Sequence, residues 1–120
     1  MFVLGRVGQD VNEYTLSTGF DVSTASYVDS FSVSSQDDFA RNIEFNKDGT
    51  KMFLSGGESD AILEYDLSTG FDVSTASYKG NVSVSTNSSA PSGITFNHDG
   101  TKVFIAVSYT HLTLPTIYSV

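Results

Sequence analysis

The side chains that could do chemistry are few in this 120-residue chain, which has two histidines and no cysteine. Without cysteine it can form neither a disulfide nor a thiolate metal site. His98 stands in a turn whose other copy carries Lys47 at the same place, so we expect a solvated position rather than a catalytic one. No serine has a histidine partner that would form a nucleophile and base pair. The sequence therefore predicts no catalytic residue and favours a non-enzymatic protein.

Recurring aspartates are the other candidates for chemistry. Asp48 and Asp99 occupy the two copies of a turn, and Asp21 and Asp72 occupy the two copies of a second loop. Ca²⁺ prefers about 6 to 8 oxygen ligands, which aspartates can supply, but the D-x-D-x-D-G spacing of a calcium loop is absent. Aspartate side chains also bond to nearby backbone N–H groups in turns. We therefore expect these residues to shape loops, with calcium as the alternative for Asp21 and Asp72 and no other cofactor.

These positions recur because the chain repeats itself. Residues 16–27, LSTGFDVSTASY, return unchanged as residues 67–78, which lie 51 positions later, and the N-x-D-G-T-K turn at 46–51 returns at 97–102 with the same offset. A period of about 20 to 50 residues is typical of proteins built from stacked structural repeats. We divide the chain into repeat 1 (1–51), repeat 2 (52–102) and the start of repeat 3 (103–106).

Strand and turn signals are dense within one repeat, and no helical period is sustained. Asp48-Gly49 between two apolar runs predicts a hairpin, because glycine supplies a positive φ and aspartate bonds its own backbone. The second strand would place Leu54 and Phe53 on opposite faces, so the sheet is expected to pack on both sides. Four-stranded antiparallel units stacked face to face describe the blades of a β-propeller, so the predicted class is all-β. The predicted strands, A to D in order, are 43–45, 50–54, 62–67 and 77–85, and the next strand A is 93–96.

The second copy of the hairpin also resembles a known family. The segment SGITFNHDGTKVFIA, residues 92–106, looks like a YVTN-type propeller repeat, which belongs to a group similar to the seven-bladed lactonase and gluconolactonase-like propellers. The resemblance covers residues 1 to about 106 and is specific for the blade, through the N-x-D-G-T-K hairpin. It implies a lactonase-like hydrolytic propeller as the alternative function, with Glu44 and Thr95 of strand A near the central channel.

The strand pattern amounts to about two blades of an incomplete ring. From residue 1 onward the predicted strands run B-C-D, A-B-C-D and A-B, whereas propellers close with about four to eight blades. We therefore expect a slice of a longer propeller, which self-associates or stays partly unfolded in isolation because its apolar sheet faces are exposed. Residues 107–120 abandon the repeat, and their first part, VSYTHLTLPT, resembles a translated sequencing-library adapter. We expect a non-native read-through tail, with a native strand as the alternative.

The charge balance narrows the range of partners. A net charge of −8 argues against nucleic acid, because binding to phosphates needs a basic surface. A divalent cation or a cationic partner is the alternative to a merely solvated acidic surface. No apolar window approaches the roughly 18 residues of a membrane span, so none is expected. The sequence leaves the location open, with a secreted, cell-surface or virion protein favoured.

Differences between the two repeats fall on one face of the predicted disc. The A–B turns and C–D crossovers are nearly identical, whereas the B–C loops (6–10 and 57–60) and the D–A loops (35–42 and 86–93) differ strongly. Variable loops on a rigid scaffold are typical of binding sites, so we predict a non-enzymatic binding or structural segment that recognises a protein or glycan, with Phe39 as anchor. Neutral drift of the loops is the alternative. The candidate binding residues are Arg6, Asp10, Asp37, Asp38, Phe39, Arg41, Glu58 and Asp60.

Overall fold

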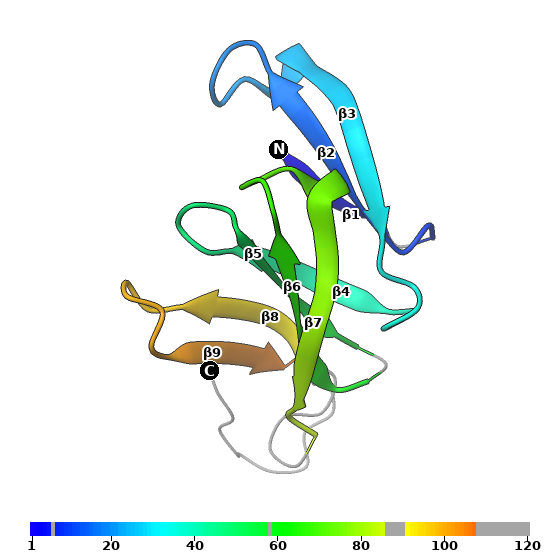
Figure 1. The fold of residues 1–120 in the computed structure, drawn as a ribbon, viewed down its shortest axis with the longest axis vertical. Coiled ribbons are helices and arrows are strands. Elements are labelled where there is room, and N and C mark those ends of the chain that lie inside the picture. The colour runs from blue at the N-terminus through cyan, green and yellow to red at the C-terminus, as the bar shows by residue number, and fades with distance from the viewer. Residues whose placement is uncertain (6, 58, 86–90, 108–120) are drawn as a thin grey trace.

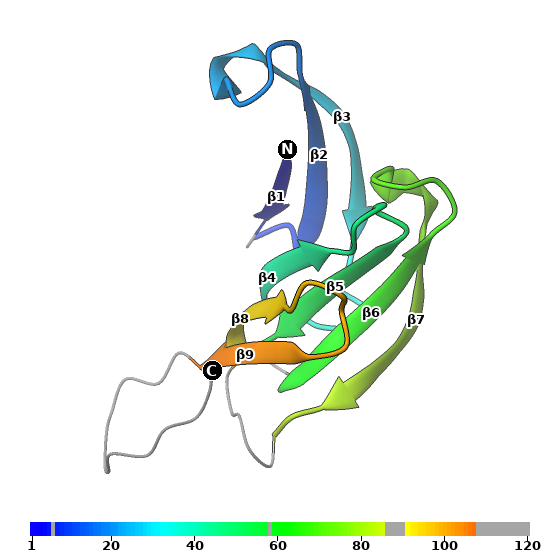
Figure 2. The same cartoon turned by 90° about the vertical axis from the view of Figure 1, so that its left-hand side faces the viewer.

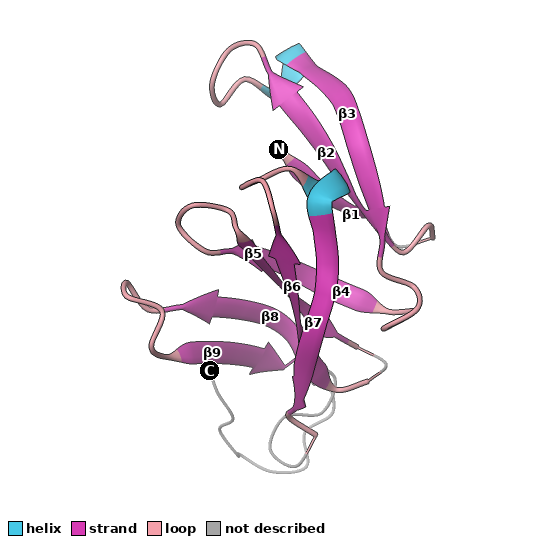
Figure 3. Cartoon of the chain, in the orientation of Figure 1, coloured by secondary structure: helices cyan, strands magenta, loops and turns pink. Residues whose placement is uncertain are grey.

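The fold is known from a computed structural model, which describes residues 1–5, 7–57, 59–85 and 91–107. These residues form three antiparallel sheets and confirm the all-β prediction (Figure 3). Sheet 1 consists of β1 (Phe2–Gly5), β2 (Asp10–Leu16) and β3 (Ala25–Ser32). Sheet 2 consists of β4 (Ala40–Phe45), β5 (Lys51–Gly56), β6 (Ala61–Leu67) and β7 (Ala76–Ser83). Sheet 3 consists of β8 (Pro91–Phe96) and β9 (Val103–Val107) (Figure 1).

The order of strands matches the blade pattern expected from the repeat. Sheet 2 runs β4-β5-β6-β7, which is the predicted order A-B-C-D, while sheet 1 holds B-C-D and sheet 3 holds A-B. The irregularities repeat as well, because the β2–β3 register shifts between Glu13 and Tyr14 and the β6–β7 register shifts between Glu64 and Tyr65. Each repeat therefore builds the same unit, and the described chain is a series of propeller-like blades.

The turn between β4 and β5 has the predicted hairpin geometry. Gly49 has a φ of 73°, and the N–H of Thr50 donates to Asp48 Oδ1 over 3.1 Å. The N–H of Lys51 donates to Asn46 Oδ1 over 2.9 Å. These bonds join both sides of the turn through side chains that the repeat supplies. The loop-shaping role predicted for Asp48 is thereby confirmed.

The crossovers after β2 and β6 each contain one turn of 3₁₀ helix, which the sequence analysis missed. These turns are η1 (Val22–Thr24) and η2 (Val73–Thr75). In η2, Asp72 Oδ1 accepts from the N–H of Ser74 over 3.1 Å and from its hydroxyl over 2.7 Å, and Asp21 caps η1 in the same way. Three residues are too short to show a helical period in a sequence. The local bonding predicted for both aspartates is confirmed.

Sheet 2 packs on both of its faces, as predicted from its second strand. Leu54 is fully buried toward sheet 1, and the ring of Phe45 lies 4.5 Å from that of Phe2 across the same interface. Phe53 points the other way, and its ring lies 4.7 Å from that of Phe96 in sheet 3. Figure 2 shows the sheets following one another, with β2 and β3 at one end and β8 and β9 at the other. Each large apolar side chain buried between sheets contributes about 1.5 to 3 kcal/mol.

The first strands of two successive blades lie together, because β4 of sheet 2 contacts β8 of sheet 3. Strands at this edge surround the central channel when blades form a ring. Among the described residues, no helix has the length and apolar character needed to cross a bilayer. Arg6, Glu58 and residues 108–120 lie outside the described residues, so the tail hypothesis stays a prediction.

Candidate functional site

The A–B hairpins of sheets 2 and 3 enclose a cavity of about 690 Å³, which we call the hairpin cavity. Its walls carry the half-buried Glu44 of β4 and the exposed Lys47 and His98, which occupy equivalent turn positions. Glu44 pairs in register with Phe53, whose ring contacts sheet 3. The side chain of Glu44 therefore lies on the face of β4 that looks toward the next blade. Asp48, Lys51 and Asp99 also line the cavity, so three carboxylates and three basic side chains share it.

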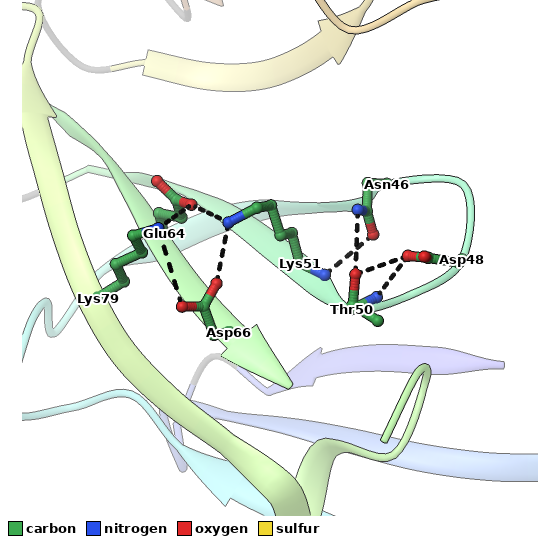
Figure 4. A network of polar contacts seen from close by, with 7 residues as sticks. All are labelled: Asn46, Asp48, Thr50, Lys51, Glu64, Asp66 and Lys79. Atoms are coloured by element: carbon green, nitrogen blue, oxygen red, sulfur yellow. Dashed lines mark hydrogen bonds and ion pairs between the residues drawn. The ribbon is translucent and has the colours of Figure 1, made fainter. Parts of the chain in front are cut away.

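Lys51, which lines the hairpin cavity, belongs to a network of four charged side chains (Figure 4). Lys51 Nζ lies 2.7 Å from Glu64 Oε2 and 3.0 Å from Asp66 Oδ1. Lys79 Nζ lies 3.9 Å from Glu64 Oε2 and 4.0 Å from Asp66 Oδ2. The sequence analysis missed this network, although Glu64 and Asp66 alternate along one strand and so share a face.

Hydrogen bonding fixes the charge states in this region. The bonds from Lys51 to Glu64 and then to Asp66 hold the pKa of Lys51 well above its usual range, and the bond from Lys51 lowers the pKa of Asp66. The hydroxyl and N–H of Thr50 lower the pKa of Asp48. Lys51 is therefore a fixed cation rather than a proton acceptor. Because these groups are partly exposed, each ion pair contributes only about 0 to 1 kcal/mol.

Asp37 joins two loops on the opposite, variable face. Its side chain is 2% exposed, its Oδ2 accepts from the N–H and hydroxyl of Ser59 over 2.8 and 2.6 Å, and its Oδ1 accepts from the N–H of Phe39 over 2.6 Å. An added Cβ at Gly56 would collide with this carboxylate, which shows how closely the loops approach. Asp37 thus holds the D–A loop against the B–C loop.

Two other predicted loop-face residues form a pair. The guanidinium of Arg41 lies 5.1 Å from the centre of the Phe39 ring. Arg41 is exposed, and the β4–β5 register shifts between Ala40 and Asn42, so Arg41 sits at a bulge. Together with Leu4 these residues line a cavity of about 360 Å³, which we call the loop-face cavity.

The remaining predicted residues are separate from this pair. Asp10 is half-buried, and its Oδ1 accepts from Asn12 Nδ2 over 3.1 Å. Asp60 has a φ of 51°, and its backbone oxygen accepts from the N–H of Val84 over 2.8 Å. Asp38 is exposed. The structure therefore brings Asp37, Phe39 and Arg41 together through one loop, and gives Asp60 a backbone role in another.

One group of carboxylates has the composition of a cation site. Oxygen atoms of Glu13, Asp29 and Asp72 lie within 4.8 Å of one another between sheets 1 and 2. Glu13 Oε1 already accepts from the N–H of Val73 over 3.1 Å. Of the aspartates considered for calcium in the sequence, Asp72 belongs to this group. Three partly exposed carboxylates are fewer than the ligands that Ca²⁺ usually takes.

Comparison with known proteins supports the fold. No family model and no curated protein matches the sequence. Solved structures that share the fold include a putative 6-phosphogluconolactonase from Bacteroides fragilis, with a TM-score of 0.65 and 12% identity. Another is a putative 6-phosphogluconolactonase from Bacteroides uniformis, with a TM-score of 0.65 and 13% identity. Each match covers 88% of this chain, which spans only 28% and 29% of the two neighbours. The lactonase-type propeller fold is thus supported, while the YVTN assignment stays a prediction.

The comparison corrects the expectation of a non-enzymatic protein. Both structural neighbours are named as putative enzymes that act on a lactone, which is the alternative that the resemblance implied. The absence of a serine–histidine pair misled the sequence analysis, because it led us to expect no catalytic residue. At 12% and 13% identity the likeness establishes the fold alone.

Proposed function

We propose that the chain is a segment of a lactonase-like hydrolytic propeller, whose reacting group in this segment is Glu44. The observation that carries the proposal is the hairpin cavity, which is lined by Glu44 of β4. β4 is the first strand of its blade, in a fold shared with putative 6-phosphogluconolactonases. Pockets lined by apolar groups with a few placed polar groups are the usual sites of small-molecule chemistry. Phe45, Phe53 and Phe96 supply the apolar part of this wall, and charged and amide side chains supply most of the rest.

The residues of the cavity suit the hydrolysis of a cyclic ester. The Glu44 carboxylate would accept a proton from a water molecule while the oxygen of that water attacks the carbonyl carbon of the lactone. The C–O bond of the ring would then break, and the ring oxygen would take up the proton from Glu44. The product is a hydroxy acid. Lys47 and His98 would stabilise the negative charge that develops on the carbonyl oxygen. A general base of this kind contributes about 10²- to 10⁴-fold in rate.

The test is hydrolysis of 6-phosphogluconolactone by the 120-residue chain, followed as acid release above the spontaneous rate. Glu44→Gln should lower kcat by about 10²- to 10⁴-fold. Asp38→Asn, which neutralises an exposed carboxylate on the opposite face, should leave kcat unchanged. A wild-type rate no faster than the spontaneous one, or an unaltered kcat in Glu44→Gln, contradicts the proposal.

Recognition at the loop face is a second candidate function, favoured by the Phe39–Arg41 pair. An exposed guanidinium beside an aromatic ring is typical of residues that dominate binding energy. The loop-face cavity beside them offers room for part of a protein or glycan ligand. Binding to an immobilised panel of oligosaccharides should weaken by about tenfold in Arg41→Ala. Equal binding by the variant and the wild type would argue against this role.

A further inference from the structure

The packing of sheet 2 on sheet 1 shows how one blade receives the next. The η2 turn contacts β2 and β3 of sheet 1, and Val73 within it is fully buried. The N–H of Val73 donates to Glu13 Oε1 of β2 over 3.1 Å. Phe31 of β3 lies in the same interface, with its ring 5.6 Å from that of Tyr65. The interface therefore has two sides: the η2 turn of one blade, and the face of β2 and β3 in the preceding blade that the turn contacts.

The molecule also carries an unused copy of each half. The η1 and η2 turns lie within identical twelve-residue segments, 16–27 and 67–78. Val22 of η1 is nevertheless 69% exposed, whereas its counterpart Val73 is fully buried. On sheet 2, Glu64 and Val82 stand one repeat after Glu13 and Phe31. They line a groove of about 420 Å³ between β6–β7 and sheet 3, which we call the blade groove, and Val82 is 61% exposed.

We propose that the blade groove binds the η1 turn of a second copy of this chain. The incoming Val22 would lie against Val82, and its backbone N–H would donate to the Glu64 carboxylate. The argument rests on the internal interface, because the same two sequence elements already bind each other once within the molecule. The contact joins two different surfaces, so it is head-to-tail and leads to chains of copies or to rings.

The charges of the blade groove suit the incoming turn better than those of the internal interface. In the internal interface Asp72 lies near two other carboxylates, Glu13 and Asp29. In the groove the position of Asp29 is taken by Gly80, and Lys79 lies 3.9 Å from the receiving Glu64. Asp66 also belongs to this cluster, and Lys51 and Lys79 pair with both of its carboxylates. An incoming Asp21 would therefore meet two lysines that the internal interface does not have at these positions, which is electrostatically more favourable.

One strand must yield when the second copy docks. β1 of the incoming copy and β9 of the receiving chain are the same strand of the repeat, because Phe2 and Phe104 lie two periods apart. Only one of them can lie beside β8. Phe2 of β1 packs against the core, whereas Val103 and Phe104 of β9 are exposed. Displacing β9 therefore costs less buried apolar surface than displacing β1. The incoming sheet 1 would then complete a four-stranded blade on β8, and its β1 would replace the part of the groove wall that Val103 and Ile105 of β9 form.

The test is sedimentation velocity of the 120-residue chain from about 1 to 100 µM, because association shifts with concentration by mass action. The wild type should form species larger than the 12.9 kDa monomer. Val22→Asp disrupts the contact on the side of the η1 turn, and Val82→Asp disrupts it on the side of the groove. Because both valine side chains are exposed, both variants should fold, and circular dichroism checks this. Each variant alone should lose the larger species. Val7→Asp, at a fully exposed loop position, is the control and should associate like the wild type.

Mixing the two variants separates this proposal from general stickiness. Val22→Asp keeps an intact groove and Val82→Asp keeps an intact turn, so an equimolar mixture should form a species of about 26 kDa and stop there, twice the 12.9 kDa chain. A wild-type chain that stays monomeric over the whole concentration range would overturn the proposal. So would variants that associate like the wild type, or a mixture that stays monomeric.

Discussion

Replacing Val73 with alanine tests the stacking of sheets 1 and 2, and the same substitution at Val22, which lies in an identical sequence, is the matched control. Val73 is fully buried in the interface, whereas Val22 is 69% exposed. Both valines begin a 3₁₀ turn capped by an aspartate, within the same twelve residues. Intrinsic propensity and local bonding therefore change equally in both variants. The difference between them reports burial alone.

The size of the effect follows from the groups removed. Val73→Ala deletes two methyl groups, which at about 0.8 kcal/mol each lose roughly 1.6 kcal/mol of transfer free energy. The cavity left behind adds to this loss because the packed sheets relax only in part. We expect the free energy of unfolding to fall by about 2 to 3 kcal/mol. Val22→Ala should change it by no more than about 0.5 kcal/mol.

Urea unfolding followed by circular dichroism measures both values, with the slope of the transition as a check on two-state behaviour. The measurement belongs at the lowest usable protein concentration, since the proposed docking of a second copy would bury Val22. Similar destabilisation by the two variants would refute the reasoning. It would mean that the internal interface does not bury Val73 in solution, and the assignment of successive blades would fail with it.

The other predictions concern the loop face and alkaline stability. Asp37→Ala should lower the free energy of unfolding by about 2 to 4 kcal/mol, because three donors on Ser59 and Phe39 lose a buried acceptor. Asp38→Ala, at an exposed neighbour, should change it by at most about 0.5 kcal/mol in the same urea assay, and equal losses would contradict the buried role. Burial, more than the nearby Tyr78 and Asp37, raises the pKa of the Tyr65 hydroxyl above its ordinary value of 10.0. The contribution of neutral Tyr65 to the free energy of unfolding is therefore complete below pH 10 and is lost as the pH rises above it. Tyr65→Phe should therefore flatten the fall in urea midpoint from about pH 8 to 11, and a fall as steep as that of the wild type would disprove this assignment.

Features that depend on neighbouring residues were predictable from the sequence. The hairpin at Asp48-Gly49 follows from turn chemistry, and the packing of sheet 2 on both faces follows from the apolar Leu54 and Phe53 on adjacent positions. The 51-residue offset predicted one strand order for every blade, and the structure confirms it. These signals are local or periodic, so a sequence displays them directly.

The candidate site was less accessible to the same reasoning. Asp37 and Asp38 are adjacent and chemically alike, yet one is buried and bonded to Ser59 while the other is exposed. Lys51 and Glu64 lie 13 residues apart and meet only through the pairing of β5 with β6. Such contacts depend on register and loop path, which short sequence windows do not contain.

Val22 and Val73 show the division between the two sources of information. The amino-acid sequence determined that both would begin a capped 3₁₀ turn after a β-strand, because the bonds that form the turn come from the same neighbouring residues. Only the tertiary structure decided that Val73 is buried and Val22 exposed, because burial depends on whether another sheet covers the turn. Local bonds act over a few residues, whereas burial is a property of surfaces brought together from distant parts of the chain.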